Sequence, residues 1–482
     1  MFKLKSSLVL ALLSVSFLYS QPITPGFEKS EYIDLLYISI QSTKRADYKK
    51  KYPQPDNYKM IYQSGELGLD NSWDLWLNEQ GRAVISIRGT TEKMESWLEN
   101  FYAAMVPAQG MVTLTGVEDK FNYKLSDDKD AAVHVGWLVG LGYLSQEIIP
   151  KIDSLYDAGI KDFLIMGHSQ GGAIAYLLTS HLHYLKESGD LNKEINFKTY
   201  CSASPKPGNL YYAYDFEHIT QGGYAFLIIN PYDWVPEVPI SIQTLKDFNP
   251  TNPFVNAEAM IKDQTIPKRW FLKHAYNKLN KPTLKAQRNY EKYLGKMTYK
   301  MVEKNLPGLE VPEYLSTNNY MRAGVPIIME PHKAYLDSFP EKSEDVFEHH
   351  FHQAYLTLAK ELPEELYKNN PGLPEGRWIV ESKIFTTSND SIPELPVPYL
   401  TIEGDNRAVK GNTGCNSFIG EYLIDGDRIM FIMNGPMTLK ACPGDQEDKF
   451  LNNLKITDGY YFDNDKIFLT SNGNDILVLE RE

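Results

Sequence analysis

The sequence has little cysteine, no histidine after position 352, and no long apolar run beyond its first twenty residues. Three cysteines in 482 residues exclude a scaffold held together by many disulfides. Because a membrane-spanning helix needs about 20 consecutive apolar residues, none is expected beyond residue 20. The length, with 43% hydrophobic and 23% charged residues, is typical of a globular protein with more than one core. We therefore expect two domains.

Basic residues are scarce relative to acidic ones. The chain has 49 Lys and Arg against 62 Asp and Glu, a formal net charge of −13. Nucleic acid is not an expected partner, because binding to it depends on a basic patch that displaces counterions. The acidic balance also gives no electrostatic help at an anionic membrane. Any contact with lipid is therefore expected to be apolar.

Residues 1–20 differ in composition from the rest of the chain. Lys3 and Lys5 precede the apolar stretch 8–18, and the segment ends at Ser20. This is the pattern of a secretory signal peptide, and it predicts an exported protein: secreted, periplasmic or at the cell surface. The alternative is an uncleaved N-terminal anchor.

No cluster of residues in the sequence matches a metal site, and we expect neither a metal nor an organic cofactor. The acidic run 127–130 lacks the glycine and the distal glutamate of an EF-hand loop. Cys415 and Cys442 lie in one C-terminal region, but two thiols with no later histidine do not complete a zinc sphere. In an oxidising compartment they can pair with each other. Cys201, in an apolar stretch, is expected to be a buried thiol.

Apolar runs typical of strands alternate with helical patterns in the first half of the chain. The expected strands are 73–77, 82–87, 163–166, 197–201 and 224–229, with a long helix at about 134–157 and a loop at 111–132. This alternation predicts an α/β fold, with a mostly parallel sheet and helices on both faces. In such sheets, ligands bind at the carboxyl ends of the strands.

The pattern is centred on residues 163–178, where a buried strand turns into a helix at Ser169. Residues 167–171, Gly-His-Ser-Gln-Gly, match the G-x-S-x-G nucleophile elbow. The two glycines avoid a clash where strand and helix approach each other. The helix directs its N-terminal amides toward the same point, so the N–H of Gln170 is available to an oxyanion. These features indicate a nucleophilic serine.

A nucleophilic serine needs a base and a carboxylate that orients the base; in this arrangement the acid follows the serine and the histidine comes last. Asp233, which follows the strand 224–229, is the acid we favour, and Glu237 is the alternative. The histidines that come later are His274, His332, His349, His350 and His352. The last three open a helix and are best placed to reach the serine. The residue pattern alone does not choose among them.

Seven segments, in register, resemble the class 3 lipases, a branch of the α/β-hydrolases. They are 87–90 with Trp97, 134–136, 167–173, 204–209, 230–236, 320–325 and 350–356. The resemblance covers roughly residues 70–360, and it implies the α/β-hydrolase fold and the hydrolysis of carboxylic esters.

The resemblance also implies roles for individual residues. It implies a catalytic triad of Ser169, Asp233 and His350. The backbone amides of Thr90 and Gln170 are implied to bind the oxyanion. His352 is the alternative base, because members of the family differ in the spacing between the histidine and a following aromatic residue.

Two segments near the implied site are candidates for covering it. Residues 92–109, with Trp97, Leu98 and Phe101, resemble the lid of the family, although these apolar side chains are equally consistent with plain core packing. The chain between the acid and the histidine is longer than is usual in the family. The excess, about 242–317, is predicted to be helical and to cap the acyl pocket.

Beyond a connector rich in proline at 362–374, the sequence consists of short β patterns. Residues 376–378, 411–422 and 437–443 resemble the META domain, a small β-rich module. Hairpins are predicted at 425–426, 463–464 and 473–474. The predicted organisation is a signal peptide at 1–20, a lipase-like domain at 21–365 and a META-like domain at 375–482. We expect the last to be non-catalytic, with an unknown partner.

The sequence therefore predicts a secreted serine hydrolase of carboxylic esters, a lipase that cleaves acylglycerols through an acyl-enzyme. Its partner is a lipid or another ester, met at a lipid–water interface. A phospholipase and a short-chain esterase are alternatives. An alternative of another class is a lipase-like binding protein with a vestigial site.

Overall fold

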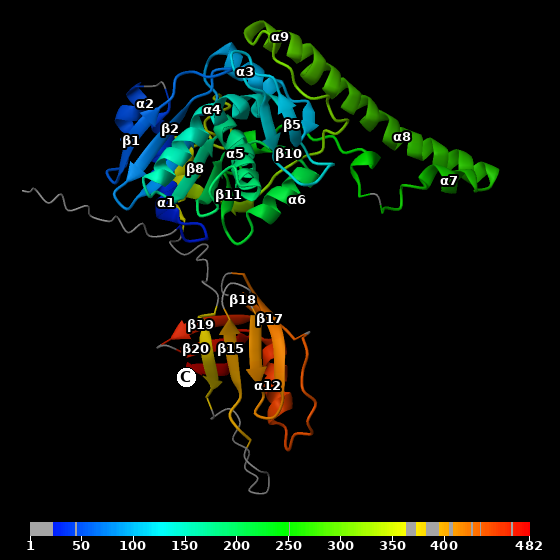
Figure 1. Cartoon of the computed structure of the whole chain (residues 1–482). Helices are drawn as coiled ribbons and strands as arrows, with labels where there is room; N and C mark the ends of the chain where they lie inside the picture. Colours follow the sequence, from blue (N-terminus) through cyan, green and yellow to red (C-terminus); the bar gives the residue numbers. More distant parts are fainter. Residues whose placement is uncertain are drawn as a thin grey trace, which may run out of the picture. The chain divides into compact units, whose positions relative to one another are not determined.

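The computed structural model describes residues 23–43, 46–249, 251–362, 373–381, 395–403, 408–425, 428–433, 435–463 and 466–482. The chain divides into two compact units, Met1–Leu366 and Tyr367–Glu482 (Figure 1). The predicted signal peptide and most of the connector lie outside the described residues. None of the described helices combines the length and the apolarity that crossing a bilayer requires.

The first unit is built on a seven-stranded sheet with the order β1-β2-β3-β8-β9-β11-β13. The strands are β1 (Tyr58–Gln63), β2 (Trp73–Asn78), β3 (Arg82–Ile87), β8 (Asp162–His168), β9 (Asn196–Ser202), β11 (Ala225–Ile229) and β13 (Val325–Ile328). The first three run antiparallel to one another, and from β3 to β13 every neighbouring pair is parallel. The predicted mostly parallel α/β sheet is confirmed.

Helices cover both faces of this sheet (Figure 1). One face carries α4 (Val135–Asp157), α5 (Gln170–Ser188) and α6 (Leu210–Ile219); the other carries α1 (Lys29–Gln41), α10 (Lys333–Ser338) and α11 (His352–Glu361), with the short α2 (Ala46–Lys51) beside α1. In β8, Phe163 and Ile165 pack into the first core, and Leu164 and Met166 into the second. All four are fully buried. Side chains alternate along a strand, so a strand covered on both faces is apolar throughout.

The prediction of a loop over 111–132 holds for most of the stretch, but it missed the strands within it and at its ends. This stretch takes part in a hairpin of β5 (Gln109–Val112) and β6 (Phe121–Lys124). It also reaches β7 (Ala132–His134), which belongs to a small sheet with β4 (Met105–Pro107), β10 (Gly208–Asn209) and β12 (Tyr320–Met321). Val112, Phe121 and Tyr123 are buried in the core beside α4. The strands are too short for their alternation to stand out in the sequence.

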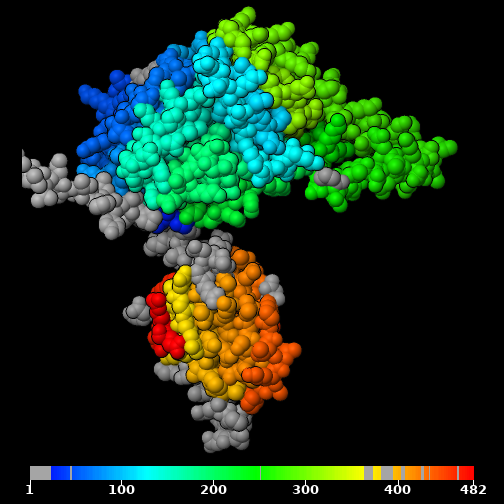
Figure 2. Space-filling model, viewed as in Figure 1, coloured from blue at the N-terminus to red at the C-terminus, as the bar shows by residue number. Residues whose placement is uncertain are grey.

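Residues 242–317, where we expected a cap, contain a series of helices. They are η2 (Leu245–Asp247), α7 (Ala257–Lys262), α8 (Ile266–Glu291), the π-helical turn η3 (Lys292–Met297) and α9 (Thr298–Asn305). Helix α8 projects away from the sheet (Figures 1 and 2), and of its 26 residues, all of them described, Gln287 alone is buried. A cap therefore stays a prediction only for η3 and α9, which pack near helix α3 (Met94–Phe101).

The second unit is an antiparallel sheet of eight strands with the order β18-β17-β16-β15-β14-β21-β20-β19. The strands are β14 (Gly376–Val380), β15 (Tyr399–Glu403), β16 (Ala408–Asn412), β17 (Ser417–Asp425), β18 (Arg428–Ile432), β19 (Gly459–Asp463), β20 (Lys466–Ser471) and β21 (Asn474–Arg481). The N–H of Ile429 donates to the carbonyl of Asp458 at 3.3 Å, so the two ends of the sheet approach each other. A helix that we did not predict, α12 (Gln446–Ile456), contributes Phe450 and Leu454 to the core.

The cysteine predictions are confirmed. Cys415 and Cys442 form a disulfide, and Cys201 is a buried free thiol. The last hairpin turns at Asn472 and Gly473, both with positive φ, one residue earlier than predicted. The turn residues of the other two predicted hairpins, 426 and 464, lie outside the described residues, although the flanking strands pair as expected.

Candidate active site

Ser169 occupies a strained turn between β8 and α5. Its backbone has φ 62° and ψ −131°, a conformation that a residue with a side chain rarely adopts. The neighbouring backbones come very close. A Cβ atom at Gly167 would lie 2.1 Å from the carbonyl oxygen of Gly171, and one at Gly171 would lie 2.2 Å from that of Ile87. Both glycines are therefore required for the serine to stand at this turn.

The structure brings Ser169, His350 and Asp233 into one chain of hydrogen bonds. The Oγ atom of Ser169 lies 2.9 Å from Nε2 of His350, and Nδ1 of His350 lies 2.8 Å from Oδ2 of Asp233. A carboxylate only accepts, so Nδ1 carries the hydrogen. The lone pair of Nε2 then faces the serine hydroxyl. This is the geometry that a general base for a serine nucleophile needs.

Asp233 is held by hydrogen bonds from three directions. Besides His350, its carboxylate accepts from the Tyr355 hydroxyl at 2.8 Å and from the N–H of Val235 at 2.9 Å, at the start of the 3₁₀ turn η1 (Val235–Glu237). The residue is 2% exposed. Glu237, the alternative acid, is exposed, and it lines a pocket beside Asp233 that contains neither Ser169 nor His350. The structure therefore places Asp233, and not Glu237, against the histidine.

His168, inside the elbow motif, fixes the backbone that carries His350. Its Nε2 lies 2.8 Å from the carbonyl oxygen of His350, and its Nδ1 lies 3.1 Å from Oγ of Ser202. The carbonyl can only accept, so Nε2–H donates to it and Nδ1 accepts from Ser202. Burial, reinforced by the nearby His352 and His350, holds the pKa of His168 well below its usual range, so the ring is neutral. The role of this motif residue was not visible in the sequence.

His352, the alternative base, lies elsewhere. Its Nε2 is 3.0 Å from Oγ of Ser39 in helix α1, and its ring stacks on His168 with centroids 4.1 Å apart. Burial lowers the pKa of His352 to about 3. The ring is thus neutral, and its Nε2 is engaged with Ser39 and not with Ser169.

The other three histidines have structural contacts. His349 lies 2.8 Å from the Tyr335 hydroxyl through Nδ1 and 3.0 Å from the Pro340 carbonyl through Nε2. His332 caps α10, accepting the N–H of Tyr335. His274 is exposed on α8 and stacks on Trp270.

Thr90 and Gln170, the two residues implied to bind an oxyanion, also lie together. The hydroxyl of Thr90 donates to Oε1 of Gln170 at 2.9 Å. Asn100 of helix α3 joins them, because its Nδ2 donates to Thr90 at 2.9 Å and to Gln170 at 2.8 Å. The Oδ1 atom of Asn100 accepts from Nε1 of Trp137 at 3.0 Å. The loop after β3 and the start of α5 are therefore fixed relative to each other.

Glu99, next to Asn100, is a buried acid within the same network. Asn71 donates to it at 2.6 Å, and its other oxygen, Oε1, has no hydrogen-bond partner among the described residues. Burial raises the pKa of Glu99 to about 8, so the side chain is neutral at pH 7. We did not predict a role for Asn100 or Glu99 from the sequence, because only the apolar residues of α3 were considered there. Two polar residues in a row inside the apolar stripe of α3 were the available signal.

An aromatic cluster borders the site. The ring of Phe347 lies 5.9 Å from that of His350 and contacts Trp97 of α3, Trp234 and Phe351. Trp97 in turn contacts Phe101, which is 55% exposed. We call Trp97, Phe101, Trp234, Phe347 and Phe351 the aromatic rim. Leu98 is buried, so the apolar face of α3 is divided between core and surface.

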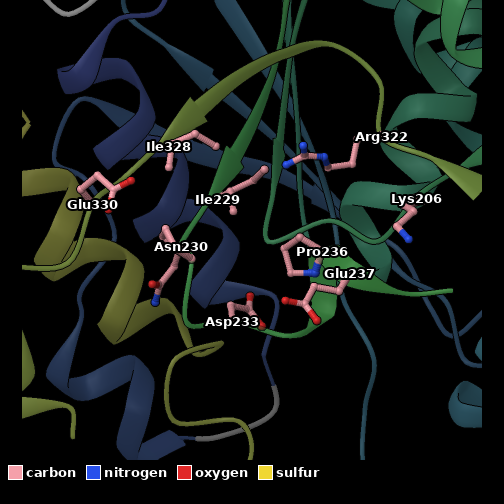
Figure 3. Close-up of a pocket in the computed structure, with 10 residues that line it drawn as sticks. Lys206, Ile229, Asn230, Asp233, Pro236, Glu237, Arg322, Ile328 and Glu330 are labelled. Atoms are coloured by element: carbon pink, nitrogen blue, oxygen red, sulfur yellow. The ribbon is translucent and has the colours of Figure 1, made fainter. Parts of the chain in front are cut away.

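A pocket of about 500 Å³ opens beside Asp233, at the ends of β11 and β13 (Figure 3). Charged side chains of both signs surround it: Lys206, Glu237, Arg322 and Glu330. Neither Ser169 nor His350 lines this pocket, so it is not the place where an ester would meet the serine.

One group of potential metal ligands occurs among the described residues. Cys415, Cys442 and Glu447 lie close enough together to share an ion. The two thiols are joined in the disulfide, so they are not available as thiolate ligands.

The comparisons with known families match both units. Residues 84–242 match the family model for lipase (class 3), and residues 373–482 match the META domain. The first match includes Thr90, Ser169, Gln170 and Asp233, and it ends before His350. No curated protein sequence matches the chain significantly.

Solved structures of fungal lipases are similar to part of the chain. Lipase II from Rhizopus niveus is 19% identical, with 44% of this chain and 75% of that chain covered and a TM-score of 0.32. Lip2 lipase from Yarrowia lipolytica is 20% identical, with 46% and 78% covered and a TM-score of 0.33. The lipase from Rhizopus microsporus var. chinensis is 20% identical, with 46% and 75% covered and a TM-score of 0.31.

Proposed function

We propose that Ser169 is the nucleophile of a lipase acting on acylglycerol esters. The proposal starts from the matches of this chain to the class 3 lipase family and to the META domain. The match of residues 84–242 to the class 3 lipase family supports a carboxylic-ester hydrolase. The observation that carries the proposal is the hydrogen-bonded chain from Ser169 through His350 to Asp233, with distances of 2.9 and 2.8 Å.

The reaction follows from this geometry. His350 takes the hydroxyl proton as Oγ of Ser169 attacks the ester carbonyl, and Asp233 stabilises the imidazolium that forms. The backbone amides of Thr90 and Gln170 bind the negative charge that develops on the carbonyl oxygen. His350 then protonates the departing alcohol, which leaves an acyl-enzyme. In the second half, His350 activates a water that attacks the acyl group and releases the acid.

The aromatic rim supports a lipid ester as the substrate. Trp97, Phe101, Trp234, Phe347 and Phe351 form a partly exposed apolar border next to His350. Exposed aromatic side chains lose contact with water when they meet a lipid surface, which favours substrates held at a lipid–water interface. A phospholipase uses the same features, so the ester class within lipids is an outcome of the assay below.

Export of the protein is part of the proposal. The signal-peptide pattern at 1–20 and the disulfide between Cys415 and Cys442 both favour an oxidising compartment outside the cytosol. Fractionation of expressing cells tests this, with cleavage near residue 20 read by N-terminal sequencing. Retention of the whole chain in the cytosol contradicts export.

The test of the function is hydrolysis of an ester chain-length series, a triglyceride emulsion and a phospholipid dispersion. Ser169→Ala and His350→Ala are each expected to lower kcat by about 10⁴-fold or more. His352→Ala is the matched control, since that ring faces Ser39 and not the serine. We expect this variant to lose stability while keeping most of its kcat. Equal rates for wild type and Ser169→Ala would support the alternative of a binding protein with a vestigial site.

A further inference from the structure

Helix α8 and the short helix α7 before it form an exposed arm on the lipase unit. The arm stands out from the body in Figures 1 and 2. The chain is fixed on both sides of the arm. Before α7, Ile242 pairs with Asn318 in an isolated β-bridge. After α8, the N–H of Ala104 donates to the carbonyl of Leu294 at 3.1 Å. Since the chain is held on both sides and Gln287 is the only buried residue of α8, whose positions are all described, the arm is available to a partner.

The tip of the arm exposes large apolar side chains. Ile266 is 80% exposed, Trp270 70% and Phe271 64%. Ile266 and Trp270 are four residues apart, so they lie on one side of α8, with Phe271 adjacent. Met260 of α7 is also exposed. Apolar groups of this size rarely gather on a surface that meets only water.

The same side of α8 continues as a basic stripe. Lys278, Lys281, Lys285 and Arg288 follow at spacings of three and four residues, and all are exposed. In all, α8 carries seven Lys and Arg and one acid, Glu291, at its last position. None of the seven forms an ion pair with a described residue. Their charge is therefore free to act on a partner.

The segment that contains the arm has a charge opposite to that of the whole chain. Residues 242–305 contain 13 Lys and Arg and five Asp and Glu, a net charge of +8, whereas the whole chain has a formal net charge of −13. An acidic protein is repelled by an anionic surface unless a basic segment reaches it first. A helix with cations along one side and Trp, Phe and Ile at one end has the composition of an interfacial membrane-binding helix.

We propose that the α7–α8 arm docks the protein onto an anionic lipid surface. Trp270, Phe271 and Ile266 enter the boundary between headgroups and acyl chains, and the basic stripe lies against the phosphates. A nucleic acid is the less favourable partner, because the apolar tip would have to leave water for a ligand that is charged along its whole length. The docking deepens the proposed lipase function, since it holds the enzyme at the surface where its esters lie.

Binding is tested with the full chain carrying Ser169→Ala, so that the lipid is not consumed. Sedimentation compares vesicles of phosphatidylcholine with vesicles of equal parts phosphatidylcholine and phosphatidylglycerol. The stripe variant is Lys278→Glu with Lys281→Glu and Lys285→Glu, and the tip variant is Trp270→Ser with Phe271→Ser. The matched control is Lys59→Glu with Lys120→Glu and Lys193→Glu, three exposed lysines elsewhere on the lipase unit, which changes the net charge equally.

We expect the anionic vesicles to bind the parent protein at least about tenfold more tightly than the neutral ones, with a loss of about tenfold or more in both arm variants. The control should stay within about threefold of the parent, since total charge matters less than its position. Equal binding by the stripe variant and the control overturns the proposal. So does equal binding to both vesicle types, or binding to a single-stranded oligonucleotide with none to vesicles.

Hydrolysis of a water-soluble ester separates this proposal from the proposed function. In the background that retains Ser169, the arm variants should hydrolyse 4-nitrophenyl acetate at the wild-type rate, because α8 projects away from the sheet that carries the serine (Figure 1). If the proposed function fails, no protein shows hydrolysis that depends on Ser169, and the vesicle comparison still reports on the arm.

Discussion

The backbone of Ser169 predicts that the protein is less stable than it could be, because it holds the proposed nucleophile in a strained conformation. The perturbation is a pair of substitutions, Ser169→Ala and Ser169→Gly. Both remove the hydroxyl and its hydrogen bond to His350, so neither variant is expected to be active. They differ in the Cβ atom alone. Any difference in unfolding free energy therefore reports the cost of placing a Cβ atom at φ 62° and ψ −131°.

The size of the difference follows from two opposing effects. A non-glycine residue in so sparsely populated a region costs about 1–3 kcal/mol, and glycine removes this cost. Glycine also makes the unfolded chain more flexible, which destabilises the folded state by about 0.4–1 kcal/mol. The backbone strain outweighs the added flexibility, so Ser169→Gly should be more stable than Ser169→Ala by about 0.5–2 kcal/mol.

Ser154 supplies the matched control. It is an exposed serine within α4, in regular helical backbone. There the strain is absent, so Ser154→Gly should be less stable than Ser154→Ala by about 0.5–1 kcal/mol. The same two replacements thus have opposite effects at the two positions.

The assay is equilibrium unfolding in urea, followed by far-ultraviolet circular dichroism, in the full chain. We expect the midpoint of Ser169→Gly to exceed that of Ser169→Ala by a few tenths of a molar, with the order reversed at residue 154. If the glycine variant unfolds at the same urea concentration as the alanine variant or earlier, no strain is stored at this turn and the reasoning is refuted.

Three further predictions concern the surroundings of the site and the second unit. Tyr355→Phe leaves Asp233 without one hydrogen bond, so it should lower the unfolding free energy by about 1.5–3 kcal/mol and kcat by about tenfold; a variant with wild-type melting and kcat contradicts this. Burial raises the pKa of Glu99 to about 8, above the ordinary 4.5, so the folded state binds the extra proton and its stability declines as the pH rises from about 4.5 to 8. In Glu99→Gln, urea titrations should show no such decline in unfolding free energy with pH. If the two proteins have the same pH profile, Glu99 does not cause the decline. Replacing Cys415 and Cys442 by serine opens a loop of 27 residues and should destabilise the second unit by about 3–4 kcal/mol with ester hydrolysis unchanged; an unchanged melting profile contradicts it.

The elbow could be predicted from the sequence because its causes are local. A side chain at position 167 would clash with the backbone of Gly171, and one at 171 would clash with the backbone of Ile87 on the adjacent strand. The apolar strand and the helix flank these glycines directly in the sequence. The position of Asp233 was likewise predictable, since an acid just after a buried strand emerges at the carboxyl edge of the sheet.

The family resemblance favoured His350, but the residue pattern alone could not decide between His350 and His352, because the deciding contacts are made with distant residues. His350 lies just before α11 and His352 is its first residue, and their directions depend on Ser39, 313 positions from His352, and on His168, 182 positions from His350. Contacts of this separation leave no periodicity in the sequence.

The net charge of the whole chain hides a local difference. The total of −13 led us to expect purely apolar contact with lipid, and it averages over a segment, 242–305, whose charge is +8. Within this segment, α8 is mostly exposed, so its local charge is what a partner meets. Charge should therefore be counted by segment wherever a chain carries an insertion.

Helix α3 shows how an element over the site can be fixed on one side and free on the other. On its inner side, Asn100 bonds Thr90 and Gln170 and accepts from Trp137, and Glu99 is buried beside Asn71. Swinging the whole helix away would break these buried hydrogen bonds at about 1 kcal/mol each or more. On its outer side, the side chains of Trp97 and Phe101 can rotate without that cost. Because the inner side also holds the two residues proposed to bind the oxyanion, a helix that left the body would dismantle the site it uncovers, so side-chain rotation is the cheaper way to open it.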